Sequence, residues 1–205
     1  MKKVVLLLQL LLSLSSCRED DFDVLPAVTQ EGLNTFGCLI DWEVLVPKDA
    51  SRSSGGRGAD GMLVTYRKDS FVNSYRPPYF DIRVINYIDQ GGDFIYLYVP
   101  SLGSRGSYTF KASNRYMGID SPHHPHAFAI LDTKEGDKTY LSYYNSGEIE
   151  FTVFDTLQTQ ASGTFSLSMV DEDTGLDTIE IRDGRFDINW RTLNCGKTLW
   201  HQPCP

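Results

Sequence analysis

The chain has 205 residues, of which 41% are hydrophobic, and its 27 acidic and 19 basic residues give a formal charge of −8. This length and hydrophobic content suit one domain with a substantial core. The excess of carboxylates argues against binding to nucleic acid and against adhesion to an anionic membrane through a basic face.

The first sixteen residues have the features of a signal peptide. Lys2 and Lys3 form a short positive region, and a largely apolar run of eleven residues follows from Val4 to Leu14. This run is too short to span a bilayer, which takes about 20 residues. Leu14-Ser15-Ser16-Cys17 then resembles the bacterial lipobox. We predict cleavage after Ser16 and acylation of Cys17, palmitate included; an ordinary secretory signal with a chance cysteine is the alternative.

An acidic stretch follows the cysteine directly. Four of the six residues from Arg18 to Asp23 are acidic, so this stretch cannot pack into a core. Cleavage removes two lysines and no acids, which leaves 17 basic and 27 acidic residues and a charge of −10. The stretch resembles the acidic export signal of surface-exposed lipoproteins. We therefore expect an outer-membrane protein that faces outward, with a periplasmic position as the alternative, and a tether and linker over residues 17–35.

Three cysteines follow Cys17, and an odd number leaves one thiol unpaired in an oxidising compartment. Cys195 and Cys204 are the nearest pair and could form a disulfide that fixes the C-terminal tail. Cys38 would then be a buried free thiol. Only His201 lies near this pair, so a zinc site there is improbable.

Short candidate strands with turn signals between them fill the rest of the chain. In order they are Met62–Tyr66, Tyr79–Asn86, Phe94–Val99, Gly106–Ala112, Ala127–Asp132, Thr139–Tyr144, Gly147–Phe154, Ala161–Val170 and Thr178–Trp190.

The alternation is strictest near the C-terminus, where Phe165, Leu167 and Met169 share one face of their strand. The residues 171–175 predict a hairpin loop, and Asp183-Gly184 predicts a bulge or tight bend. No segment has sustained helical periodicity. These features predict an all-β protein, an antiparallel β-sandwich of the jelly-roll kind, as a single domain over residues 36–205.

The segment from Leu25 to Leu39, LPAVTQEGLNTFGCL, closely resembles the "LPxxTQxGxNTFGCL" opening of a family of Bacteroidota lipoproteins of unknown function. Ser162–Ser166 and Ile181–Asp187 resemble the closing strands of that family. The family usually has Asn-Gly in the turn after this motif, whereas this chain has Asp41-Trp42-Glu43. The resemblance implies a β-rich lipoprotein domain and transfers no catalytic residue.

The same motif also has an interpretation from its residues alone. Gly32 and Gly37 permit backbone conformations that other residues avoid. The side chains of Thr29, Gln30 and Asn34 can form hydrogen bonds where the chain enters the domain. We expect an architectural role for the motif, with a binding site as the alternative.

Two polar clusters suggest metal chemistry only weakly. His123, His124 and His126 lie within four residues, but the two prolines among them predict a solvated loop without the second shell that a metal site needs. The acids at 171, 173 and 177 surround Gly175 but lack the full spacing of a calcium loop, so a hairpin tip is the better interpretation. We therefore predict no metal and no cofactor.

Tyr75, Arg76 and Tyr79 form the best candidate for a binding surface, because two aromatic rings and a guanidinium lie on a proline-stiffened segment. Such a surface suits a glycan or protein ligand; the alternative is that Tyr79 begins a strand and packs inward. No catalytic motif is present. The sequence thus predicts a non-catalytic binding or assembly role, with an accessory subunit of an envelope complex as the alternative and a hydrolase as a third, weaker hypothesis.

Overall fold

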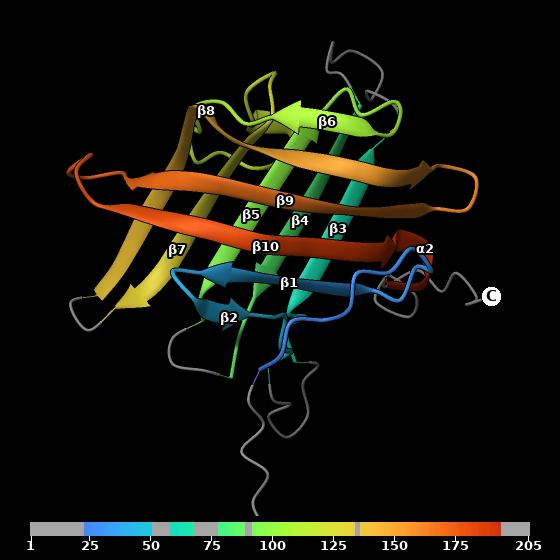
Figure 1. The fold of residues 1–205 in the computed structure, drawn as a ribbon, viewed down its shortest axis with the longest axis horizontal. Coiled ribbons are helices and arrows are strands. Elements are labelled where there is room, and N and C mark those ends of the chain that lie inside the picture. Colours follow the sequence, from blue (N-terminus) through green and yellow to red (C-terminus); the bar gives the residue numbers. More distant parts are fainter. Residues whose placement is uncertain (1–22, 51–57, 68–77, 89–91, 134–135, 194–205) are drawn as a thin grey trace, which may run out of the picture.

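The computed structural model describes residues 23–50, 58–67, 78–88, 92–133 and 136–193 (Figure 1). The described elements are β1 (Thr35–Ile40), β2 (Glu43–Leu45), β3 (Met62–Arg67), β4 (Tyr79–Ile85), β5 (Phe94–Pro100), β6 (Gly106–Thr109), η1 (Gly118–Asp120), β7 (His126–Thr133), β8 (Gly136–Asp155), β9 (Gln160–Asp171), β10 (Thr178–Asn189) and α2 (Trp190–Leu193). None of the described helices is long and apolar enough to cross a membrane.

The strands form one antiparallel sheet in the order β2-β1-β10-β9-β8-β7-β5-β4-β3, and β6 pairs with β8 beside this path. Figure 1 shows how the sheet curls over itself: β9, β10 and β1 run across the front, and β3, β4, β5 and β7 cross behind them. The prediction of an antiparallel all-β fold is confirmed. The sandwich itself is not confirmed, because the described strands pair in one continuous, curled sheet.

The long strand β8 makes this curl. Residues 136–141 pair with β7 in the rear layer, and residues 140–155 pair with β9 in the front layer. The register shifts between Ser142 and Gly147, where the strand leaves one partner and continues along the other. Four residues, 143–146, stand opposite the single Ser168 here, and such extra residues bend a strand and raise its twist, as a bulge does. One strand therefore joins the two layers that face one another across the core.

The core lies between the layers and follows the period of two that the sequence shows. On β5, Ile95, Leu97 and Val99 face the main core, whereas Tyr96 and Tyr98 belong to a second cluster on the opposite face. Both faces of this strand are buried. The second cluster is closed by the segment before β7, since the Gly118 N–H donates to the Tyr96 hydroxyl over 2.8 Å.

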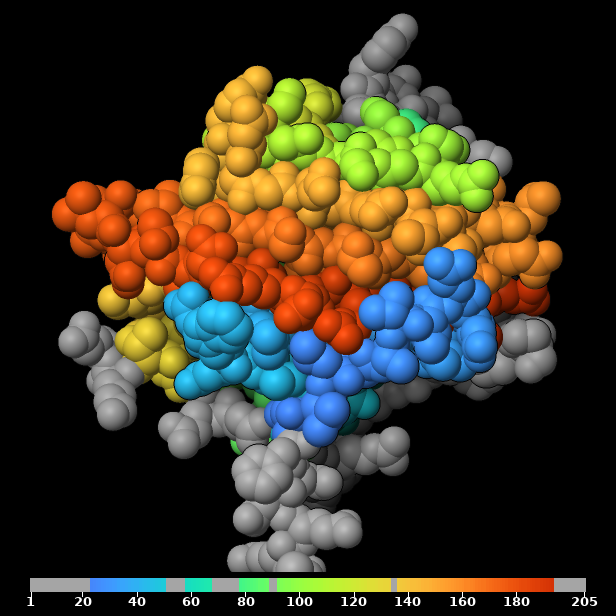
Figure 2. Space-filling view, in the orientation of Figure 1, coloured from blue at the N-terminus to red at the C-terminus, as the bar shows by residue number. Residues whose placement is uncertain are grey.

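The described N-terminal segment, blue in Figure 2, lies against the orange and red strands and is part of the body rather than a free linker. Asp187 on β10 is 1% exposed, and its carboxylate accepts hydrogen bonds from the Thr29 hydroxyl and from the N–H groups of Glu31, Gly32 and Leu33, at 2.7 to 3.3 Å. The Ser162 hydroxyl on β9 donates a fifth, at 2.7 Å. The predicted linker over residues 17–35 is therefore corrected: its described residues are held on the domain as far back as Asp23.

These contacts also set the charge state of Asp187. Burial by itself raises the pKa of this carboxyl, but the hydrogen bonds from Ser162, Thr29 and the backbone outweigh it and lower the pKa to about 2. The opening motif and the closing strand thus meet at one buried carboxylate. This contact supports the architectural role expected for the motif.

Two glycines show how closely the front layer is packed. A Cβ on Gly163 would lie 1.9 Å from the Glu150 carbonyl oxygen and 2.7 Å from the Phe186 ring. A Cβ on Gly184 would lie 2.6 Å from Phe165. The register between β10 and β9 shifts from Ile181 to Gly184, and Asp183 has a φ of 51°, so the predicted bulge is confirmed.

Candidate binding cleft

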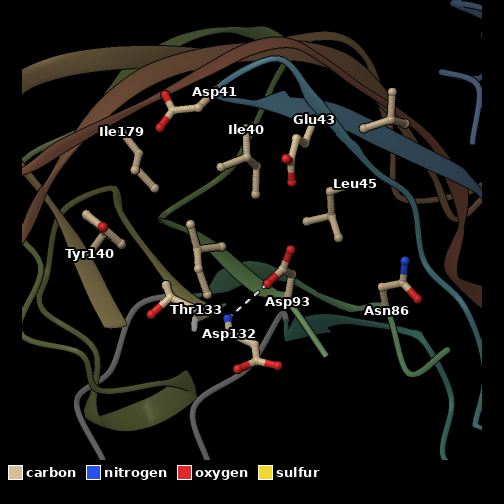
Figure 3. Close-up of a pocket in the computed structure, with 12 residues that line it drawn as sticks. Ile40, Asp41, Glu43, Leu45, Asn86, Asp93, Asp132, Thr133, Tyr140 and Ile179 are labelled. Carbon is tan, nitrogen blue, oxygen red and sulfur yellow. Dashed lines mark hydrogen bonds between the residues drawn. The ribbon is translucent and has the colours of Figure 1, made fainter. Parts of the chain in front are cut away.

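A cleft of about 460 Å³ opens between the two layers at one end of the sheet (Figure 3). Five apolar side chains line it, three of them buried, together with four carboxylates. The apolar residues are Ile40, Val44, Leu45, Leu131 and Ile179; the acidic ones are Asp41, Glu43, Asp93 and Asp132; Asn86, Thr133 and Tyr140 complete the lining. None of the described residues that line the cleft is basic.

The β1–β2 hairpin supplies one wall of the cleft. Ile40 pairs with Glu43, which leaves Asp41 and Trp42 as a two-residue turn with φ values of 45° and 78°. Positive φ at both central positions is the geometry of the type I′ turn, which normally selects Asn-Gly. Here the strain is offset by pairing with β10: Asp41 N–H donates to the Glu180 carbonyl, and Glu180 N–H donates to the Asp41 carboxylate at 2.9 Å.

The opposite wall comes from the start of β5 and the end of β7. Asp93 precedes β5, and one oxygen of its carboxylate accepts a hydrogen bond from Asp132 N–H at 3.1 Å, drawn as the dashed line in Figure 3. Burial raises the pKa of Asp93, whereas the hydrogen bond from Asp132 N–H lowers it. The nearby carboxylates of Glu43 and Asp132 raise the pKa as well, so the net shift is upward. The cleft therefore holds a half-buried carboxyl among like charges.

Tyr140 closes the cleft on the β8 side and is 4% exposed. Its hydroxyl donates to the Asp177 carboxylate at 2.8 Å, and Lys138 Nζ lies 3.3 Å from the same oxygen. Burial, followed by the interaction with Asp177, raises the pKa of Tyr140. The lysine of this strand is thus engaged by Asp177 rather than by the acids in the cleft.

A second set of polar side chains, those of Asp81, Arg83 and Tyr96, lies on the outer face of the rear layer. Asp81 on β4 is fully buried; its carboxylate is 3.4 Å from Arg83 Nη2 and 3.5 Å from the Tyr96 hydroxyl. Burial raises the pKa of Asp81 more than Arg83, Thr65 and Tyr96 lower it. Asp81 Oδ1, Arg83 Nε and His126 Nε2 are buried with no hydrogen-bond partner in the described part of the chain.

The histidine-rich segment does not converge on a metal site. His126 begins β7 instead of lying in a loop and is fully buried, with its ring packed against those of Tyr96 and Tyr98. It accepts or donates one hydrogen bond with the Ser113 hydroxyl at 2.9 Å. Burial, with a smaller effect of His124, lowers the pKa of His126 to about 3. His124 bonds to the Ala112 carbonyl. Among the described residues no three His, Cys, Asp or Glu side chains are grouped to hold a metal ion.

The predicted surface of Tyr75, Arg76 and Tyr79 is described only at Tyr79. This tyrosine begins β4, is 6% exposed and packs against Tyr98 with ring centroids 5.4 Å apart. The structure thus corrects its expected exposure in favour of the inward packing weighed as the alternative. Tyr75 and Arg76 lie outside the described residues, as do Cys17, Cys195 and Cys204, whereas Cys38 is a buried free thiol.

The acids around Gly175 form a hairpin tip, as expected. Asp171 Oδ1 accepts hydrogen bonds from the N–H groups of Asp173 and Thr174, and Gly175 N–H donates to the Asp171 carbonyl. Asp177 is engaged by Tyr140 and Lys138. These hydrogen bonds stabilise the turn and join Asp177 to β8.

Comparison with known proteins adds no relative. No family profile, no curated protein and no solved structure matches this chain. The cleft residues were not marked by any sequence motif: Asp93 and Asp132 stand beside turns as ordinary solvated acids would. Only Asp41 attracts notice, because Asp41-Trp42 forms the two-residue turn that normally selects Asn-Gly.

Proposed function

We propose that this protein is an outer-membrane lipoprotein, anchored through Cys17 and displayed outward, that binds a small organic cation with an apolar part in its cleft. The lipobox and the acidic stretch behind it support the location. The cleft supports the binding role. The role is non-catalytic and needs no cofactor.

The observation that carries the binding proposal is the lining of the cleft. A volume of about 460 Å³ lies in the range of small-molecule sites, which combine apolar walls with a few placed polar groups. Here the partly exposed side chains of Val44 and Leu131 offer apolar surface, backed by the three buried apolar residues, and the carboxylates provide only negative charge. A bound cation would offset the repulsion that Glu43 and Asp132 exert on Asp93.

The test compares ligands of one shape and different charge. Tryptamine, tryptophol and indole-3-propionate carry an amine, a hydroxyl and a carboxylate on the same ring system. Calorimetric titration at low ionic strength should give about tenfold tighter binding of the amine than of the alcohol. Tenfold corresponds to about 1.4 kcal/mol, which lies between the value of about 1 kcal/mol for a close charge pair in bulk water and that of about 4 kcal/mol for such a pair near a protein surface. Equal binding of the three, or none, would refute the proposal.

Matched variants locate the site. Glu43→Gln should remove most of the preference for the amine, because its carboxylate lines the cleft. Glu148→Gln removes an exposed carboxylate on β8 that lies outside the cleft, and should leave the preference unchanged. Binding of the amine should also weaken as the pH falls and Asp93, whose pKa is raised, becomes protonated.

The location has its own test. Incorporation of an alkynyl palmitate analogue should be lost in Cys17→Ser, and protease added to intact cells should digest the domain. Protection until the cells are lysed would contradict the outward orientation and leave the periplasmic alternative.

A hydrolase is the second candidate, because one observation favours it: the cleft holds a carboxyl of raised pKa, Asp93, beside the carboxylate of Glu43. Acid–base pairs of glycosidases have this character. Chromogenic glycosides test it directly. Turnover that is lost in both Asp93→Asn and Glu43→Gln would establish it; no turnover across the panel leaves the binding role.

A further inference from the structure

The described chain begins at a fixed point on the body. The Asp23 carboxylate lies 2.8 Å from Lys48 Nζ, and both side chains are mostly buried. Lys48 is itself joined to the end of β4, since its N–H donates to the Ile85 carbonyl and its carbonyl accepts from Tyr87 N–H. The N-terminal segment therefore leaves the domain beside the β4–β5 connection, at the end that lies lowest in Figure 1.

The chain between this point and the lipid site is short. Five residues lie between Cys17 and Asp23, so six Cα-to-Cα steps join them. Because an extended residue spans at most about 3.6 Å, these residues reach no farther than about 20 Å. With Cys17 acylated, the end of the body that carries Lys48 must stay this close to the membrane.

Exposed apolar side chains surround the same point. Val24 is 76% exposed, Tyr87 42% and Ile88 65%. The Ile88 N–H donates to the Asn86 side chain at 3.0 Å, which fixes the backbone of this tip. Scattered exposed apolar residues are common on protein surfaces. Val24, Tyr87 and Ile88 differ from the other exposed apolar residues in their position near Lys48. Val24 follows Asp23, which forms an ion pair with Lys48, and Ile88 follows Tyr87, whose N–H donates to the Lys48 carbonyl.

We propose that Val24, Tyr87 and Ile88 form a docking surface for the lipid to which the protein is anchored. This inference rests on the acylation of Cys17 in the proposed function and adds the orientation of the body. Tyrosine and isoleucine suit the boundary between headgroups and acyl chains. A short tether gives the surface a high effective concentration, so a weak intrinsic affinity is enough.

The charges near this surface select the kind of lipid. The tether carries Glu19, Asp20 and Asp21, and Asp49 follows Lys48 on the body. Anionic headgroups repel such a cluster. The docking surface therefore fits lipid of low net charge. Asn86 both pairs with Lys48 and lines the cleft, so docking also places the cleft on the membrane-proximal part of the body.

Photocrosslinking on vesicles tests the orientation. The lipidated full chain, with p-benzoylphenylalanine in place of Ile88, is reconstituted in phosphatidylcholine vesicles, and lipid adducts are counted by mass spectrometry. Leu157 and Leu176 are matched controls: they are 91% and 88% exposed and lie in the β8–β9 and β9–β10 turns, away from the start of the described chain. Adducts at position 88 should exceed those at the controls about fivefold and fall when phosphatidylglycerol is added.

The outcomes separate the two proposals. The intact mass first shows whether Cys17 carries lipid; a chain without lipid would overturn the anchoring and this inference together. A lipidated chain that floats with the vesicles but shows no excess of adducts at position 88 would overturn the docking surface alone and leave the anchoring intact.

Discussion

Replacing Asp187 on β10 with asparagine should weaken the fold, because this carboxylate holds the N-terminal segment on the domain. The carboxylate accepts five hydrogen bonds, from the Thr29 and Ser162 hydroxyls and from the N–H groups of residues 31–33. An asparagine has one acceptor oxygen, and its NH₂ group would face donors at the other. At least two of these donors, most of which are partly buried, would therefore lose their acceptor.

The magnitude follows from two contributions. The pKa of Asp187 falls from 3.8 to about 2, and this difference corresponds to about 2 kcal/mol of stability above the unfolded pKa. Each unsatisfied buried donor costs about 1 to 3 kcal/mol, although part of this cost is the same interaction counted again. We expect Asp187→Asn to lose about 3 to 5 kcal/mol of unfolding free energy, a large share of the total for a domain of this size.

Urea denaturation of the chain with Cys17→Ser, which carries no lipid, measures this loss at pH 7. The sign of the pH dependence is a further check: a depressed carboxyl pKa stabilises the fold above pH 4, and this part is lost as the pH falls from about 4 to 2. The variant should lack that loss. Asp183→Asn, on the same strand but with a side chain 63% exposed, is the control and should cost under about 0.5 kcal/mol. A loss below about 1 kcal/mol for Asp187→Asn, or an unchanged acid dependence, would refute the reasoning.

Three further outcomes follow from the packing. Gly163→Ala should lower the melting temperature by well over ten degrees or prevent folding, because its Cβ would lie 1.9 Å from the Glu150 carbonyl; Gly175→Ala, which meets nothing within 4 Å, should cost about 1 kcal/mol from its positive φ alone. Burial raises the pKa of the Cys38 thiol to about 12, so a disulfide reagent should modify Cys38 in urea but not in the native chain; fast native modification would contradict its burial. His126, with a pKa lowered to about 3, should keep the NMR chemical shifts of a neutral imidazole from pH 8 to pH 5. The free energy of unfolding should decrease as the pH falls through this range, because His126 in the unfolded chain gains a proton below about pH 6.5. A titration midpoint near 6.5 in the folded chain would exclude the buried position of His126.

The strands could be predicted because their alternation is local. Phe165, Leu167 and Met169 are all buried in β9, as their spacing indicates. The number of strands is predicted less well: no candidate strand corresponds to the three-residue β2, and the two candidates Thr139–Tyr144 and Gly147–Phe154 form the single strand β8. In the structure Asn145 has a φ of 61° and the register against β9 shifts between Ser142 and Gly147, so the chain passes through this irregularity and continues as one strand.

The candidate site could not be predicted, because it depends on how the sheet curls. Asp41, Asp93 and Asp132 stand far apart in sequence and meet only where the two layers approach. The same limit hid the role of the N-terminal segment. Glu31 and its neighbours look solvated until Asp187, 156 residues away, supplies the buried acceptor that binds their N–H groups.

The pairing of the first strand with the last has a consequence for how the chain assembles. Thr35 on β1 lies opposite Asp187 on β10, and β2 can join the sheet only through β1. Contacts of such long sequence separation require a large loop to close before they stabilise anything, which slows folding. The hairpins from β3 to β10 can form in order as the chain emerges, whereas β1 cannot pair with the rest of the sheet until β10 has arrived. If the protein is exported as proposed, the front layer is completed only after translocation is nearly finished, and the described segment that emerges first is among the last to fold.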